Sequence, residues 1–350
     1  MSSAYLEKAL GAAPPPAPLE FVAFVVPVFL LCVIIPIVPY VLLWLYAAIY
    51  MVISCDARGL KKLPPPPPES VPSIKVRRER TIFFLRHGES EWNFVFNKKP
   101  VILAPFRLVY TCIKEFFLFG RDSLFLDSPL NTEGLTQAAE AADIVEKLVP
   151  EDAVFVASPL RRAVSTLLLA FEKRLQRKRV KVWHCLQEIS RNVDTASITP
   201  ARETPPVSRK EQKMYPQCVT MYDRVLDVSG FEGNKTLGRR GVNRIQEFAR
   251  KIFDQPELRP KPLVVGAHSL YFKHFFNIYL PELTAYGPKQ LSDNQRDLAT
   301  LARTKKIHNG GLVSFVLQEC ETISGQMFYR VRPGSIKEVY KGFEGSKKTQ

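Results

Sequence analysis

The chain carries Leu85-Arg86-His87-Gly88-Glu89-Ser90 immediately after the apolar run Thr81-Ile82-Phe83-Phe84. The run predicts a buried strand, and the glycine lets the following backbone turn and approach a ligand closely. A histidine beside an arginine at the carboxyl end of a strand offers a nucleophile and an anion-binding group. The segment therefore predicts a covalent phosphoryl-transfer site at the edge of a sheet.

Beyond Thr81, apolar runs alternate with helical patterns. The runs predict strands at 153–157, 180–183, 263–266 and 312–317, and the helical patterns predict helices at 134–148, 160–175 and 241–253. This alternation predicts an α/β sandwich with a mainly parallel sheet, and such folds place their ligand sites at the carboxyl ends of the strands.

Further candidate residues follow three of these predicted strands. Arg161 and Arg162 open the helix after 153–157, so that one of them points over the sheet edge beside a positively polarised helix end. His268 follows its strand as His87 follows the first, and Glu188 supplies a carboxylate. Groups that attack, hold and protonate a phosphate are thus expected at one edge of the sheet.

The composition narrows the classes of partner. Of the 350 residues, 49 are Lys or Arg and 34 are Asp or Glu, which leaves a net charge of +15 and favours phosphorylated substrates or acidic lipid headgroups. The sequence has no zinc-finger spacing and no RNA-binding signature, so nucleic acid is not an expected partner. The six cysteines are scattered, which predicts a reduced, cytosol-facing chain without disulfides; no metal and no cofactor is expected.

An N-terminal run predicts membrane residence. From Phe21 to Cys55 the sequence has no charged residue, whereas roughly 20 apolar residues suffice to span a bilayer. Pro36 and Pro39 interrupt the run, so two topologies stay open: one tilted helix over roughly 28–53, or a re-entrant hairpin. Basic residues follow the run, which places the remainder of an integral membrane protein on the cytosolic side.

These features divide the chain into five parts. We expect an N-terminal tail at 1–20, a membrane segment at 21–55, a basic proline-rich linker at 56–79, a catalytic domain at 80–335 and a basic tail at 336–350. The run Pro64–Pro68 predicts an extended spacer that holds the domain off the bilayer.

Five sequence blocks bear a family resemblance. LRHGESEWN, DSPLNTEGLTQA, SPLRRAVST, LQE and VVGAHS occur in this order between Arg80 and Arg332. On these blocks the chain resembles the histidine phosphatase, or phosphoglycerate mutase-like, superfamily, in the branch with the RHGE motif. The resemblance implies a three-layer α/β sandwich with a mainly parallel sheet.

The resemblance also implies a role for each matched residue. His87 is the nucleophile that forms a phosphohistidine, and Glu188 protonates the leaving oxygen and then activates water. Arg162, rather than Arg161, fits the family pattern. The expected catalytic set is His87, Glu188, Arg86, Arg162 and His268, and the expected substrate-binding set is Arg86, Asn93, Arg162, His268 and Ser269.

The residues after Glu188 separate two activities within this superfamily. The mutases continue with an arginine, a histidine and an aromatic-glycine pair, whereas this chain continues Ile189-Ser190-Arg191-Asn192. The departure favours phosphomonoester hydrolysis over mutase-type transfer. A catalytically silent phospho-ligand-binding scaffold at a membrane is a third interpretation. The substrate stays open among a phosphoprotein, a phosphoinositide and a small metabolite.

Two segments have open roles. The insertion at 94–126 is longer than the family leads us to expect, and its part 101–119 is apolar and aromatic, including Phe116, Phe117 and Phe119. It suits a lid over the site, a segment lying on the bilayer, or plain core packing. The polar stretch 190–235 follows Glu188 and is either a gate to the site or a surface loop.

Overall fold

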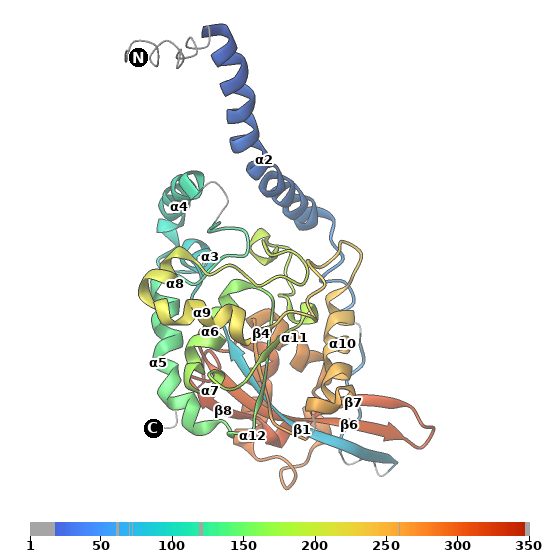
Figure 1. Ribbon diagram of the computed structural model, residues 1–350. Coiled ribbons are helices and arrows are strands. Elements are labelled where there is room, and N and C mark those ends of the chain that lie inside the picture. Colours follow the sequence, from blue (N-terminus) through green and yellow to red (C-terminus); the bar gives the residue numbers. More distant parts are fainter. Residues whose placement is uncertain are drawn as a thin grey trace, which may run out of the picture. The chain divides into compact units, whose positions relative to one another are not determined.

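The computed structural model describes residues 18–60, 63–69, 71, 73–118, 122–258 and 260–346 (Figure 1); side chains are not described at 18–21, 29–30, 32–36 and 257. The chain forms two units, Met1–Leu45 and Tyr46–Gln350. Residues 1–17 of the predicted tail at 1–20 lie outside the described residues, as does Phe119 of the apolar part of the insertion.

The charge-free run forms one helix, α2 (Pro18–Ile53), rather than the two helices of a re-entrant hairpin. Its described side chains include many exposed apolar ones, such as Phe24 and Leu42. Among the described residues, no helix meets the combined length and hydropathy needed to cross a membrane. The membrane segment predicted at 21–55 thus finds no support in the structure, and part of it falls on residues whose side chains are not described.

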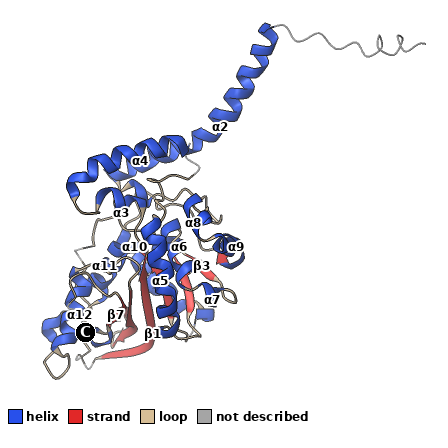
Figure 2. Cartoon of the chain, turned by 90° about the vertical axis from the view of Figure 1, so that its left-hand side faces the viewer, coloured by secondary structure: helices blue, strands red, loops and turns tan. Residues whose placement is uncertain are grey.

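Eight strands form one mixed sheet (Figures 1 and 2). They are β1 (Ile74–Arg86), β2 (Val154–Ala157), β3 (Val180–Val182), β4 (Leu226–Asp227), β5 (Leu263–Ala267), β6 (Leu312–Thr322), β7 (Met327–Val331) and β8 (Lys337–Tyr340). The order is β4-β3-β2-β5-β1-β6-β7, with β8 paired to β6. The strands from β4 to β1 are parallel, whereas β6 pairs antiparallel with β1, β7 and β8. The α/β class is confirmed, and the sheet is mixed rather than mainly parallel.

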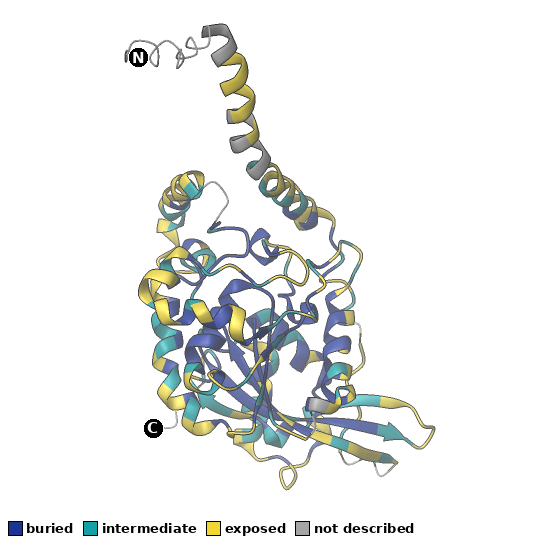
Figure 3. Ribbon diagram, viewed as in Figure 1, coloured by how far each residue is buried: buried dark blue, intermediate teal, exposed yellow. Residues whose placement is uncertain are grey.

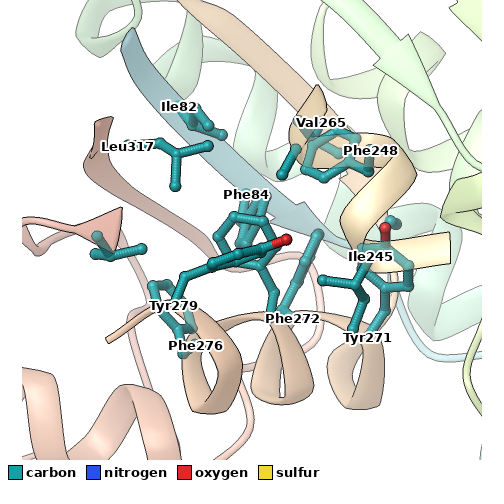
Figure 4. Close-up of a cluster of buried hydrophobic side chains, with 14 of the residues drawn as sticks. Ile82, Phe84, Ile245, Phe248, Val265, Tyr271, Phe272, Phe276, Tyr279 and Leu317 are labelled. Carbon is teal, nitrogen blue, oxygen red and sulfur yellow. The ribbon is translucent and has the colours of Figure 1, made fainter. Parts of the chain in front are cut away.

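The central strand β1 contributes to two cores, one on each face of the sheet. Ile82 and Phe84 belong to one core, and Phe83 and Leu85 belong to the other, as the alternation of side chains along a strand requires. The ring of Phe84 stacks on Phe272 at 4.0 Å between centroids, within a cluster of aromatic side chains (Figure 4). Two helical layers therefore enclose the sheet.

The helices divide between these two faces. Beside Phe84 lie α10 (Gly241–Asp254), α11 (Ser269–Tyr279) and α12 (Asp293–Thr304); beside Leu85 lie α5 (Thr132–Leu148), α6 (Arg161–Ala170), α7 (Glu172–Leu175) and α9 (Pro216–Val225). The remaining helices are α3 (Glu91–Phe96), α4 (Ala104–Leu118) and α8 (Arg209–Met214). The helix predicted at 160–175 is thus two helices, α6 and α7.

The predicted linker at 56–79 is part of the domain rather than a spacer. Leu60 is buried in the core, and the Pro67 carbonyl accepts a hydrogen bond from Arg330 Nη1 at 3.0 Å. Strand β1 already begins at Ile74. The proline run therefore contacts the domain at Pro67, whose carbonyl accepts this bond from β7, while Pro64, Pro65 and Pro67 stay exposed.

The predicted tail at 336–350 also belongs to the domain over its described residues. Strand β8 joins β6, and Phe343 is buried in the core beside Ile336. The positive charge of this segment suggested a solvated tail, but its apolar residues complete the edge of the sheet.

A buried carboxyl group joins α8 to α6 and α9. Glu211 accepts hydrogen bonds from Ser165 Oγ at 2.6 Å and from Tyr222 OH at 3.0 Å, and it is 1% exposed. Burial raises the pKa of Glu211 to about 7 from an ordinary value of 4.5. The folded chain thus holds this proton more tightly than the unfolded chain does.

We expect Glu211→Gln to remove a pH dependence of stability. The contribution of the protonated carboxyl is fully present below pH 4.5 and is lost as the pH rises through about 7. Above that pH, the variant should be more stable than the wild type, by up to roughly 3 kcal/mol at 1.36 kcal/mol per pKa unit. Urea denaturation from pH 5 to pH 9 measures the effect, and parallel curves for the two proteins would contradict it.

Candidate active site

His87 lies at the end of β1 with its imidazole buried. Its Nδ1 lies 2.6 Å from the Gly88 carbonyl oxygen. Since a carbonyl only accepts, Nδ1 carries the proton and the lone pair is on Nε2. Burial, with the positive charges of Arg162 and Arg86, holds the pKa of His87 well below its usual value. His87 is therefore a neutral imidazole with a nucleophilic Nε2.

The turn after His87 admits only glycine. A Cβ on Gly88 would lie 2.4 Å from the Gly134 carbonyl oxygen, at the start of α5. The Gly88 amide donates a hydrogen bond to Thr166 Oγ1 on α6 at 3.0 Å. These contacts fix the backbone that follows the histidine against two helices.

The two neighbouring arginines of α6 have different environments. Arg161 is engaged in the buried interior, where it pairs with Asp122 at 2.6 Å and donates to the Asp127 carbonyl at 3.0 Å. Arg162 lines the cavity beside His87 and pairs with Asp194 at 3.1 Å. Its Nε is buried without a hydrogen-bond partner. The placement agrees with the choice of Arg162 over Arg161.

Arg86 and His268 complete the positive side of the site. Arg86 is buried, and its Nη1 lies 3.0 Å from a carboxylate oxygen of Glu344. The His268 ring lies 5.2 Å from the His87 ring, and its Nε2 is 2.7 Å from Ser158 Oγ. The Nε of Arg86 and the Nδ1 of His268 are buried without partners. Unsatisfied polar atoms thus gather around His87, as expected where an anion binds.

Glu188 lies across the cavity from these groups. Its Oε1 accepts hydrogen bonds from the Ile189 amide at 3.0 Å and the Tyr271 amide at 2.9 Å. Burial raises the pKa of Glu188, although the charge of Arg162 opposes the rise. A raised pKa favours the protonated carboxyl, which is the form that can donate a proton.

The predicted site residues meet at one cavity of about 140 Å³. Its lining includes Arg86, His87, Asn93, Arg162, Glu188 and Ser269. His268 is not among the lining residues, but its ring centre lies 5.2 Å from the ring centre of His87. A second cavity of about 590 Å³ shares Arg86, Asn93, Asn97 and Lys306 with the first. The structure thus brings every predicted residue together, and their catalytic roles stay predictions.

Sequence reasoning missed several polar residues of the site. Asp194 pairs with Arg162, Ser158 contacts His268, and Lys306 lines both cavities. Ser158 lies in a matched block, and Asp194 lies in the polar stretch 190–235, but neither position carried a signal of its own. Burial raises the pKa of Asp194, which makes it a second protonatable carboxyl in the cavity.

The two segments with open roles both contribute to the cavities. The polar stretch supplies Ser190, Asn192, Asp194 and Thr195 to the wall of the smaller cavity. The start of the insertion lines the larger cavity with Phe96, Asn97, Lys98 and Val101. Among the described residues, no group of three or more His, Cys, Asp or Glu side chains is arranged to hold a metal ion.

A buried ion cluster supports the backbone of Glu188. Asp56, which follows α2, is fully buried and pairs with Lys235 at 3.0 Å and with Arg244 at 2.5 Å. Lys235 Nζ donates to the Glu188 carbonyl at 2.8 Å and to the Ser190 carbonyl at 2.5 Å. Arg244 also donates to the Gln187 carbonyl. Asp56 thus neutralises the two cations that hold the Glu188 loop.

We expect Asp56→Asn to destabilise the chain by about 3–5 kcal/mol, because it leaves two cations buried without their partner. A control is Asp143→Asn. Asp143 pairs with Lys173 at 3.2 Å, but the two side chains are 81% and 77% exposed, so this pair should contribute about 1 kcal/mol or less. Urea denaturation of both variants compares the costs, and equal small losses would contradict the role of Asp56.

One known sequence family matches part of the chain. Residues 121–217 match a sequence model described as histidine phosphatase superfamily (branch 1). The matched segment contains Arg162, Glu188 and Asp194, and it lies between the strands that precede His87 and His268. A search of curated proteins finds no match.

Solved structures with similar chains have low identity and low structural scores. A mycobacterial glucosyl-3-phosphoglycerate phosphatase is 18% identical (TM-score 0.35), with 72% of this chain and 97% of that chain covered. A phosphoserine phosphatase from Entamoeba histolytica is 17% identical (TM-score 0.32), with 67% of this chain and 90% of that chain covered. A phosphoglycerate mutase from Bacillus anthracis is 14% identical (TM-score 0.35), with 73% of this chain and 93% of that chain covered.

Residues 121–217 thus match the histidine phosphatase superfamily (branch 1), and the relationship of the rest of the chain to that superfamily stays a prediction.

Proposed function

We propose that the chain hydrolyses a phosphomonoester through a phosphohistidine at His87. The observation that carries the proposal is the meeting of His87, Arg86, Arg162 and Glu188 in one cavity. The His268 ring centre lies 5.2 Å from that of His87, whose proton is on Nδ1. The superfamily match over residues 121–217 supports it.

The reaction has two displacements at phosphorus. In the first, Nε2 of His87 attacks the phosphorus, the bond to the ester oxygen breaks, and Glu188 gives its proton to that oxygen. In the second, the Glu188 carboxylate takes a proton from water, the water oxygen attacks the phosphorus, and the bond to Nε2 breaks. Inorganic phosphate leaves, and Glu188 is protonated again.

The cationic groups stabilise the charge of the transferring phosphoryl group. Arg86 and Arg162 are buried, so their interaction with the phosphoryl oxygens is weakly screened. In the structure, Arg86 pairs with Glu344 and Arg162 pairs with Asp194. The substrate phosphate would compete with these two carboxylates for the arginines.

Hydrolysis is preferred over mutase-type transfer because Glu188 is followed by Ile189-Ser190-Arg191-Asn192 and not by the residues typical of mutases. A catalytically silent scaffold would not need the whole set of His87, Glu188, Arg86, Arg162 and His268, and all five are present. We also propose a membrane-anchored chain with its catalytic domain facing the cytosol. The charge-free run and the basic residues that follow it in the sequence support this placement.

Product analysis on the purified full-length chain tests the proposed function. With an aryl phosphomonoester, in the presence of 3-phosphoglycerate as acceptor, we expect phosphate to be released into water. Stoichiometric transfer to the acceptor would support a mutase instead. Saturable binding of the ester without turnover at any pH from 5 to 9 would support the scaffold and overturn the proposal.

A further inference from the structure

Helix α4 carries many exposed apolar side chains, and much of its ribbon is coloured as exposed or intermediate in Figure 3. The exposed side chains recur every three or four residues, which places them on one helix face. They are Phe106 (74% exposed), Val109 (60%), Tyr110 (54%), Ile113 (55%), Phe116 (71%) and Phe117 (68%). The preceding turn, Val101–Leu103, is also exposed and apolar. Exposed apolar surface of this extent marks a binding face.

The other side of α4 contacts the domain. Arg107 Nη2 donates to the Lys98 carbonyl at 2.6 Å, and Thr111 is buried. One carboxylate oxygen of Glu115 accepts from the Leu124 amide at 2.6 Å. Three apolar residues are half-buried on this same side, Ala104, Leu108 and Leu118. The inward side of α4 thus makes both polar and apolar contacts, while a second apolar face is exposed.

No described residue of α4 lines either cavity of the site. The lining of the larger cavity includes Phe96, Asn97, Lys98 and Val101, which precede α4 in the chain. The insertion thus has two parts: residues 94–101 border the site, and α4 faces outward.

The charges around α4 identify its partner. Lys98, Lys99 and Lys114 are exposed. The Lys98 ammonium lies 3.8 Å from a carboxylate oxygen of Glu89, and the Lys114 ammonium lies 4.3 Å from the centre of the Tyr110 ring. Glu115 is the one acidic residue between 98 and 118, and it is turned toward Leu124. A second copy of this surface would bring lysines against lysines. Lysines beside an aromatic and apolar face match a bilayer surface with anionic headgroups.

We propose that α4 lies in the plane of an anionic phospholipid surface, with its apolar face among the acyl chains and its lysines at the headgroup phosphates. Docking in this way brings Phe96 and Val101, which line the larger cavity, toward the membrane interface, because they shortly precede α4. The inference does not depend on the reaction at His87, so either proposal can fail alone.

A native cysteine allows a direct test. Cys112 lies on α4 and is exposed. In the full-length chain with Cys32→Ser and Cys55→Ser, a polarity-sensitive dye on Cys112 reports the surroundings of α4, whatever the state of α2. The chain is placed in vesicles of phosphatidylcholine alone or with phosphatidylserine. We expect a blue shift and protection from aqueous iodide with the anionic vesicles, and a smaller effect with the neutral ones.

Two variants sharpen the test. Phe106→Glu with Phe116→Glu should abolish the blue shift, whereas Ile323→Glu should retain it, since Ile323 is 85% exposed in the turn between β6 and β7. An unchanged spectrum in both vesicles would overturn the proposal. A blue shift that grows with protein concentration without vesicles would overturn it in favour of a second copy, and equal shifts in both vesicle types would overturn the anionic preference.

Discussion

Replacing His87 with asparagine is expected to lower turnover of a phosphomonoester at least about 10³-fold, because the variant has no imidazole nitrogen to attack phosphorus. An asparagine can still fit the buried position, so binding of the ester should fall much less than turnover. Steady-state rates and equilibrium binding of the ester to the purified full-length variant measure the two effects separately.

A second histidine provides the control. His184 is also buried, but it lies by the Gly230 carbonyl and Glu247 and lines neither cavity of the site. His184→Asn should therefore retain turnover at a temperature where it is folded by circular dichroism. If His87→Asn turned over at the wild-type rate, His87 could not be the nucleophile.

Replacing Glu188 with glutamine is expected to reduce turnover of an alkyl phosphomonoester by about 10²–10⁴-fold, the usual contribution of general acid–base catalysis. The wild-type rate of the first step should fall as the pH rises through the raised pKa of Glu188, because the proton donor is lost there. Arg162, Asp194 and Lys235 all face this carboxyl and also set its pKa. The glutamine variant should lack this alkaline limb.

The leaving group distinguishes chemistry from misfolding. An activated aryl ester needs no proton on its leaving oxygen, so its release from the Glu188→Gln variant should be affected far less than that of an alkyl ester. Glu319→Gln is a control, because Glu319 is a buried carboxylate that pairs with Arg78 on β1. Equal losses for both esters would argue against Glu188 as the proton donor.

The sequence predicted the part of the site that depends on local order. His87 and His268 each follow a buried strand, and β1 and β5 are parallel neighbours, so their carboxyl ends meet at one edge. Arg162 is set by its position in the first turn of α6. These placements follow from short-range patterns that one sequence displays.

The remaining parts depend on contacts between distant segments. Asp56 reaches Lys235 across 179 positions, and Glu344 reaches Arg86 across 258. In the sequence, both acids lie in segments that resemble solvated linkers or tails. No periodic pattern marks a charged residue that is buried by a partner far along the chain. The helical period of α4 was equally unable to show which of its sides faces the domain.

The most direct measurement traps the phosphoenzyme. The full-length chain is mixed with a ³²P-labelled phosphomonoester, quenched with alkali within milliseconds, and digested for peptide mapping. The account predicts label that is stable to alkali, labile to acid and confined to His87, and that appears and decays at rates compatible with turnover. Turnover without label at His87 in any phase of the reaction would contradict it.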